Sequence, residues 1–340
     1  MRKFKLKRNF ITLIILLITY YIIINYVYIN SIHPHYEYTG FILDINPLKI
    51  IEGICLLLFV IIPILYLIYK NNHYFFIIYL FCLFQVIPSI TLFTLTNFIR
   101  TPVYCTIGFL IICLLIKPLN FKISKIHFNE KKSLFMLTTI ATILSMPFII
   151  NFGLNINWKL FILQEIYDQR NILATKSNAY MGYIKSWINS ILFPIILIIG
   201  KRYKKLHYIL FSCLFILYFF TIGGTKGTLF SLLVITFFLI IKKNYIKQLI
   251  WFTSSLIIII IISELIAKLF DIYLAHSLFT RRTILLPSLI KQYYFEFFQN
   301  QKQLLSHGFL NFLGPSNLSE KPQNIIGGLY FNNFNQSVNK

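Results

Sequence analysis

The chain has 340 residues, of which 57% are hydrophobic and 12% charged, and its mean hydropathy is +0.72. One soluble core of this length could not bury so much apolar surface, so the composition excludes a soluble globular protein. The formal net charge of +22 would suggest nucleic-acid binding if the basic residues were gathered on one domain. They lie instead in short runs between apolar stretches, which is typical of a membrane protein, and no nucleic-acid partner is expected.

Nine apolar stretches approach the length of about 20 residues that a helix needs to cross a bilayer. In chain order they are 10–29, 50–69, 74–97, 101–116, 133–152, 184–200, 206–222, 227–241 and 248–269. The first follows a basic N-terminus but has no small-residue cleavage site, which favours a retained helix over a signal peptide. We therefore predict an all-α, polytopic integral membrane protein with about nine transmembrane helices.

The basic residues predict the orientation of these helices. If the N-terminus is cytoplasmic, the inner segments are 1–9, 70–73, 117–132, 201–205 and 242–247. These segments hold 18 of the 32 lysines and arginines and a single acidic residue. Cytoplasmic segments of membrane proteins carry such an excess, so we expect a multi-pass protein of the inner cell membrane with a cytoplasmic N-terminus.

This orientation places the long connections 30–49, 153–183 and 270–340 outside. We expect a transmembrane bundle over 1–269 and an outer-face tail over 270–340. Functional residues concentrate on loops, so we look for them on the outer side.

No motif for a nucleotide, a cofactor or a metal is present. The five cysteines all lie in apolar runs and form no CxxC pair. His33 and His35 lack an evident third ligand, which favours an ordinary interfacial pair over a metal site. We expect neither a metal nor another cofactor.

Basic residues on the predicted outer side are the strongest candidates for a site. Arg170 lies in the polar stretch 165–171, Lys226 in the turn Gly223–Gly227, and Arg281 and Arg282 follow the ninth stretch. Arginine presents a planar donor fork to phosphate oxygens. In the turn, Gly224, Thr225 and Gly227 would add backbone N–H groups at a helix start, where an anion is favoured. The pattern predicts a phosphate-binding site.

Simpler interpretations remain open for these residues. The cations could be topology anchors that reach lipid headgroups, and Arg170 could pair with Glu165 or Asp168. His307 is a candidate general base on the tail. Glu264 and Lys268, four residues apart on one helix, are expected to form a self-neutralising pair. We expect Lys185, like other lysines of this side, to be an ordinary interface charge.

Together these features resemble the Wzy-type polymerases of O-antigen and capsular polysaccharide, the oligosaccharide repeat-unit polymerases. The resemblance rests on the topology, on Tyr167-Asp168-Gln169-Arg170, on Gly223-Gly224-Thr225-Lys226-Gly227, and on Arg281-Arg282 with Pro287 downstream. The tail also looks like the last large outer loop of that family. Such polymerases continue into two or more further helices, so we expect this chain to be incomplete relative to them.

The resemblance implies a metal-independent glycosyltransferase. It would transfer a growing glycan from polyprenyl pyrophosphate to the next lipid-linked repeat unit. Arg170, Arg281, Arg282 and Lys226 would stabilise the departing pyrophosphate, while Glu165, Asp168 or His307 would accept the proton. Its partners would be the bilayer, the polyprenyl-linked oligosaccharide, a flippase and a chain-length regulator. An O-antigen ligase, a lipid-linked oligosaccharide flippase and a structural subunit are the alternatives.

Overall fold

The computed structural model describes residues 2–69, 75–115, 130–154, 169, 172–173, 175–176, 179–224, 226–241, 245–300 and 322–331. Every regular element in these ranges is a helix. Seven helices are long and apolar enough to cross a membrane, and Thr101–Leu115 and Gly227–Ile240 are shorter apolar helices. The prediction of an all-α polytopic membrane protein is confirmed. Of the nine predicted spans, the fourth and eighth correspond to the two shorter helices.

Residue contacts divide the chain into two compact units, one of Met1–Leu119 with Asn244–Lys340 and one of Asn120–Lys243. The boundary predicted at residue 269 separates the last predicted span from the tail. The two units are instead defined by which residues pack together, so they do not test that boundary. Within the first unit, the segment after residue 269 forms helices that contact the N-terminal ones.

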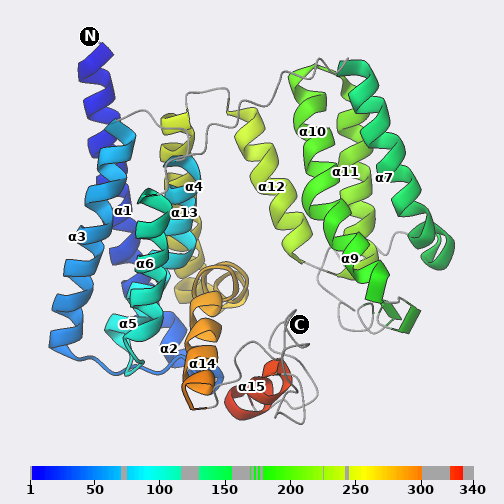
Figure 1. The fold of residues 1–340 in the computed structure, drawn as a ribbon. Coiled ribbons are helices and arrows are strands. Elements are labelled where there is room, and N and C mark those ends of the chain that lie inside the picture. The colour runs from blue at the N-terminus through cyan, green and yellow to red at the C-terminus, as the bar shows by residue number, and fades with distance from the viewer. Residues whose placement is uncertain are drawn as a thin grey trace. The chain divides into compact units, whose positions relative to one another are not determined.

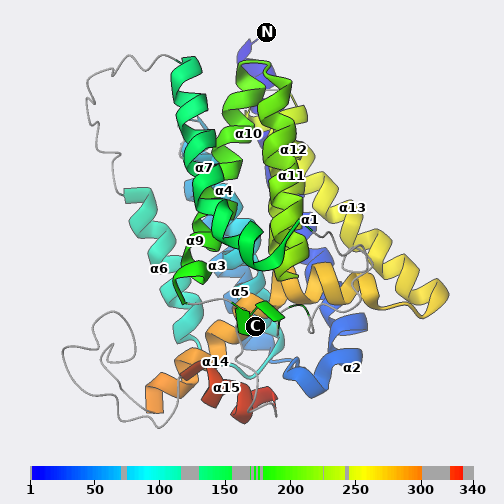
Figure 2. The same ribbon diagram turned by 90° about the vertical axis from the view of Figure 1, so that its right-hand side faces the viewer.

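The first unit is a bundle in which α1 packs along α13 and α3 packs along α5. Its elements are α1 (Arg2–Val27), η1 (Tyr28–Ile32), α2 (His33–Tyr36), η2 (Glu37–Thr39), α3 (Pro47–Tyr69), α4 (Phe75–Phe81), η3 (Cys82–Val86), α5 (Ile87–Leu95), α6 (Thr101–Leu115), α13 (Tyr245–Phe270), η6 (His276–Leu285), α14 (Leu286–Asn300) and α15 (Pro322–Phe331). Both views place α2, α14 and α15 at the end of this unit opposite the N-terminus (Figures 1 and 2).

The second unit is built around an antiparallel pair of helices, α10 and α11, against which α7 and α12 pack. Its elements are α7 (Glu130–Phe152), α9 (Ala179–Trp187), η5 (Ile188–Leu192), α10 (Phe193–Arg202), α11 (Leu206–Gly223) and α12 (Lys226–Ile240). Fully buried aromatic rings of Phe148, Phe193 and Phe219 form its centre. Aromatic edge-to-face contacts such as Phe148–Phe219, at 5.0 Å between centroids, order this core.

The segments η1, η3, η5 and η6 are π-helical, and each ends two residues before a proline. These prolines are Pro34, Pro88, Pro194 and Pro287. A proline has no N–H and its ring collides with the carbonyl four residues earlier. In each case the residue before the proline instead donates its N–H to the carbonyl five residues earlier, as Leu286 does to Arg281. The wider turn therefore relieves the clash and rotates the faces that follow it.

Gly53 allows the close packing of α3 against α5. A Cβ atom at this position would lie 2.1 Å from Cγ2 of Thr94, whose side chain is buried and branched. Small residues permit such close approach between membrane helices. We predict that Gly53→Ala destabilises the protein by about 1–3 kcal/mol, the usual cost of overpacking, and lowers its unfolding temperature in detergent.

Gly108→Ala is the matched control, because a Cβ atom there meets nothing within 4 Å on α6. This second variant should unfold at the wild-type temperature or slightly above it. Equal melting of the two variants would contradict the proposed contact between α3 and α5.

Candidate functional site

The π-helical segment η6 carries Arg281 and Arg282, two of the predicted site residues. It contacts α13, α5, α14 and the other π-helical segments η1 and η3 of the same unit. Pro287, which the sequence analysis noted downstream, follows this stretch by two residues, and Leu286 bonds to the carbonyl of Arg281. Because π-helical turns often occur at functional sites, η6 is the natural centre of a site in this unit.

The guanidinium of Arg281 is partly buried and lies over an aromatic ring. Its Cζ is 4.2 Å from the centroid of Tyr36, and Nη2 donates a hydrogen bond to Oγ of Ser277 at 3.1 Å. Tyr38 is near enough to favour the charge of Arg281, while Nε of Arg281 is buried without a hydrogen-bond partner. Burial and the neighbouring charge of Arg282 lower the pKa of Arg281. The group still stays protonated, because the pKa of an arginine starts so high.

No carboxylate among the described residues forms an ion pair with Arg281 or with the exposed Arg282. Two adjacent cations, one of them partly desolvated, therefore stand together without a paired carboxylate in the part of the chain that the structure describes. Such a pair has spare donors and uncompensated positive charge for an anion. Binding of phosphate by this pair stays a prediction.

A polar cluster anchors η6 to α13 and η1. Its members Ser31, Glu264 and His276 are buried, and the exposed Lys268 pairs with Glu264 at its edge. Glu264 accepts a hydrogen bond from Oγ of Ser31 at 2.7 Å, and its Oε2 lies 3.0 Å from Nε2 of the fully buried His276. The predicted pair with Lys268 is confirmed, with Nζ 3.2 Å from Oε1. The sequence analysis missed Ser31 and His276, which turn a simple pair into a link between three elements.

Aromatic residues of α2 and η2 form the wall beside Arg281. His35 stacks on Tyr273 with 3.6 Å between ring centroids, and the hydroxyl of Tyr36 donates to the carbonyl of Tyr273 at 3.2 Å. His33 and His35 each use Nδ1 in a hydrogen-bond contact with a backbone carbonyl. No group of three metal-ligating side chains occurs within the described ranges. These two histidines therefore help to fold the segment.

The glycine turn of the second unit differs from the prediction at Gly224, because its N–H, expected to be free for an anion, is used to end α11. Gly224 adopts a left-handed conformation with φ of 55°, its N–H bonds to the carbonyl of Phe220, and α12 begins at Lys226. A Cβ atom on Gly227 would meet nothing within 4 Å. Gly227 stays a predicted backbone donor at the start of α12, and Gly224 does not.

The expectation that Lys185 is an ordinary interface charge is wrong. Its side chain is 8% exposed, and a Cβ atom on Gly223 would lie 1.7 Å from its Nζ. The ammonium therefore sits against the C-terminal end of α11, where helix carbonyls favour a cation. A lysine next to Gly-Gly could not be recognised from the sequence because 38 residues separate it from Gly223.

Several predicted residues lie outside the described part of the chain. These are Glu165, Asp168, Arg170, Thr225 and His307. The helical position of Lys226 is described, and its side chain is not. The roles of these residues, and the meeting of Lys226 with Arg281, stay predictions.

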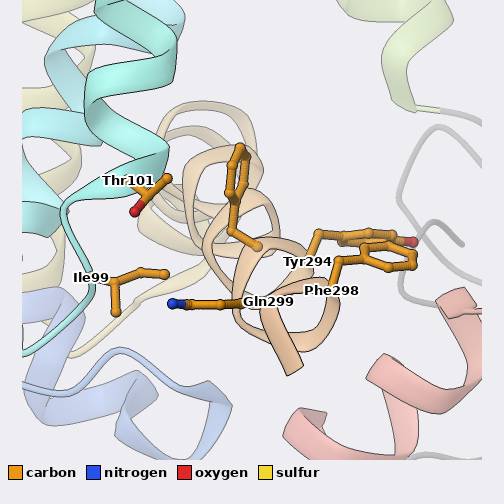
Figure 3. A pocket seen from close by; sticks show the side chains of 6 residues that line it. Ile99, Thr101, Tyr294, Phe298 and Gln299 are labelled. Carbon is orange, nitrogen blue, oxygen red and sulfur yellow. The ribbon is translucent and has the colours of Figure 1, made fainter. Parts of the chain in front are cut away.

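A pocket of about 420 Å³ lies between α14 and the start of α6 (Figure 3). It is lined by Ile99, Thr101, Tyr294, Phe295, Phe298 and Gln299. Aromatic side chains dominate this lining, and a hydroxyl and an amide contribute polar groups. Such a pocket suits the apolar part of a small ligand.

Lys291, on α14, is a partly buried cation that sequence reasoning missed. Its Nζ donates to Oγ of Ser89 at 2.7 Å and to Oγ1 of Thr106 at 2.6 Å. Burial lowers the pKa of Lys291 to about 8. The sequence feature that could have pointed to this residue is a single lysine at the start of the aromatic stretch 291–298. Lys291 binds α14 to α5 and α6, because its ammonium bridges hydroxyls from both helices.

Comparison with known proteins leaves the family open: no family model matches the chain, and no curated protein or solved structure matches it either.

We predict that His276→Ala lowers the unfolding free energy by about 3–5 kcal/mol. The substitution leaves a cavity and removes a partner of buried Glu264, and each effect is costly. Thermal unfolding of the purified protein in detergent measures the change. His207→Ala, which alters an exposed histidine, is the control and should unfold like the wild type. Similar small shifts for both variants would show that the buried cluster does not stabilise η6.

The stability of the protein should also depend on pH through His276. Burial lowers the pKa of its imidazole below the ordinary value of about 6.5, against the opposing influence of Glu264. The unfolded chain then binds a proton more readily, so stability should fall as the pH decreases through about 6.5. Unfolding temperatures measured across this range should fall less steeply for His276→Gln. Parallel curves for the two proteins would contradict this assignment.

Proposed function

We propose that the protein polymerises polyprenyl-pyrophosphate-linked oligosaccharide repeat units on the outer face of the inner membrane. The observation that carries the proposal is the Arg281–Arg282 pair, which lies without a carboxylate partner among the described residues. The all-α membrane fold and the resemblance of short motifs to Wzy-type polymerases support it further. The two arginines are the described residues to which we assign pyrophosphate binding.

The position of the arginines agrees with the predicted orientation. Arg281 contacts Tyr36 of α2, and α2 lies at the end of its unit opposite the N-terminus (Figures 1 and 2). With a cytoplasmic N-terminus, as the distribution of basic residues predicts, this end faces outward. The proposed reaction therefore takes place where surface polysaccharide is assembled.

The proposed reaction exchanges one glycosidic bond for another. The bond between the anomeric carbon of the donor glycan and its pyrophosphate breaks, and a hydroxyl of the acceptor repeat unit forms the new bond. Negative charge grows on the departing pyrophosphate, where Arg281 and Arg282 stabilise it electrostatically. The acceptor proton passes to a base, for which Glu165, Asp168 and His307 remain the candidates. His276 is unsuited to this role because it is fully buried beside Glu264.

A ligase that moves finished glycan to another carrier would use the same pyrophosphate chemistry and differ in its acceptor. A flippase would need charged groups free to line a pathway. The exposed Lys268 and the partly buried Lys291 each have hydrogen-bond partners within the first unit, which favours a transferase. Flippase and chain-length regulator are proposed as partners of the polymerase.

Complementation of a polymerase-null strain with the gene that encodes this chain tests the proposal. We predict that Arg281→Ala and Arg282→Ala each reduce polymer formation by roughly 100-fold or more, the usual effect of losing one charge-stabilising donor. Arg281→Lys should retain part of the activity, since it keeps the charge and loses the planar fork. The readout is the ladder of glycan lengths on a gel, normalised to the amount of protein in the membrane.

Arg202→Ala is the matched control, because this exposed arginine ends α10 on the predicted cytoplasmic side. It should give a normal ladder. A normal ladder from Arg281→Ala and Arg282→Ala would overturn the proposed function. Single repeat units on the acceptor instead of a ladder in the wild type would identify a ligase.

A further inference from the structure

Four aromatic side chains lie on the segments next to Arg281, and we call them the aromatic shelf: His35, Tyr36, Tyr38 and Tyr273. Arg281 lies over the ring of Tyr36 at 4.2 Å, and Tyr38 is near enough to favour its charge. The rings of Tyr36 and Tyr38 are 6.4 Å apart, and His35 stacks on Tyr273 at 3.6 Å. Aromatic surface therefore continues outward from the cation on more than one side.

The shelf is partly open although it is rigidly built. Tyr38 is 78% exposed, and His35 is also exposed, whereas Tyr36 is 9% exposed. Side-chain contacts with backbone hold the segment: Tyr36 with the carbonyl of Tyr273, and His35 with the carbonyl of Ser31. An exposed ring held beside a charged group is prepared for a ligand, because little conformational entropy is lost when a ligand binds.

The turn after the shelf is also fixed. Gly40 has φ of 90°, which other residues rarely adopt, and its carbonyl accepts a hydrogen bond from Tyr293 at 3.2 Å. A Cβ atom on Gly40 would collide with the hydroxyl of Tyr293, at 1.8 Å. The chain therefore leaves the shelf in one direction, with α14 packed against it.

We propose that the aromatic shelf binds the sugar ring directly attached to the phosphate that Arg281 holds, so that the ligand is a glycosyl pyrophosphate. A pyranose ring has a face of C–H groups and an edge of hydroxyls. The face of an aromatic ring is negative and attracts such C–H groups, while the imidazole of His35 can exchange hydrogen bonds with hydroxyls. The inference rests on the proposed function, and it adds that Tyr38 recognises the first sugar.

A bare phosphate or a lipid headgroup would gain nothing from this surface. Either would use the charge of Arg281 and Arg282, but neither presents a flat C–H face to Tyr38. Binding that depends on Tyr38 only when a sugar is present is therefore the signature of the shelf.

Two probes distinguish binding through the phosphate charge from binding through the sugar. They are farnesyl pyrophosphate, and farnesyl pyrophosphate with N-acetylglucosamine on its terminal phosphate. Their dissociation constants are measured by isothermal titration of the purified chain in nanodiscs. We expect Tyr38→Leu to weaken binding of the glycosylated probe about three- to tenfold, the usual effect of one aromatic contact, and to leave binding of farnesyl pyrophosphate unchanged. Tyr38→Phe keeps the ring and should bind the two probes in the wild-type ratio.

Tyr180→Leu is the control, since this tyrosine on α9 is 81% exposed and belongs to the other unit. It should bind both probes like the wild type, and melting temperatures should show that all variants are folded. Arg281→Ala should weaken the binding of both probes. An unchanged ratio of the two dissociation constants in Tyr38→Leu would overturn the proposed sugar binding by the shelf and leave the pyrophosphate site standing. Unchanged binding of both probes by Arg281→Ala would overturn the proposed pyrophosphate site, and with it the shelf.

Discussion

Four prolines that follow π-helical segments are the constraint on which much of the proposed site depends, whereas Pro63 and Pro147 lie inside α-helices. Pro34, Pro88, Pro194 and Pro287 each follow a π-helical segment in which the chain bonds to the carbonyl five residues back. In a bilayer, a carbonyl without a partner is expensive, so the wider turn both avoids the clash and keeps the backbone bonded. Each such turn also changes which side chains face the neighbouring helices.

Two of these turns meet at the proposed site. η1 supplies Ser31, η6 supplies His276 and Arg281, and α13 supplies Glu264. The carboxylate of Glu264 holds the two π-helical segments together from within the unit. Arg281 lies one helical turn beyond His276 and is left with aromatic and hydroxyl neighbours. The buried cluster of Ser31, Glu264 and His276 thus fixes the segment η6 that carries Arg281. The charge of Arg281 itself has no carboxylate partner among the described residues.

Sequence reasoning located the apolar helices and the Arg281–Arg282 pair because hydropathy and charge can be read locally along the chain. The sequence showed Pro287 but not the π-helical segment before it, since such a turn depends on how the freed carbonyl is bonded. The cluster was invisible because 233 residues separate Ser31 from Glu264. Lys185 was assigned to the surface because only its packing against Gly223 shows that it is buried. Tyr36 and Tyr38 resembled ordinary aromatic residues of a membrane interface.

The central claim is that Arg281 and Arg282 hold a pyrophosphate group. An experimental structure of the protein in a nanodisc with polyprenyl pyrophosphate tests it most directly. The account predicts density for the two phosphate groups within hydrogen-bonding distance of both guanidinium groups, at the η6 end of the first unit. The account would be contradicted by pyrophosphate density elsewhere, for example at the pocket between α6 and α14, with none beside Arg281.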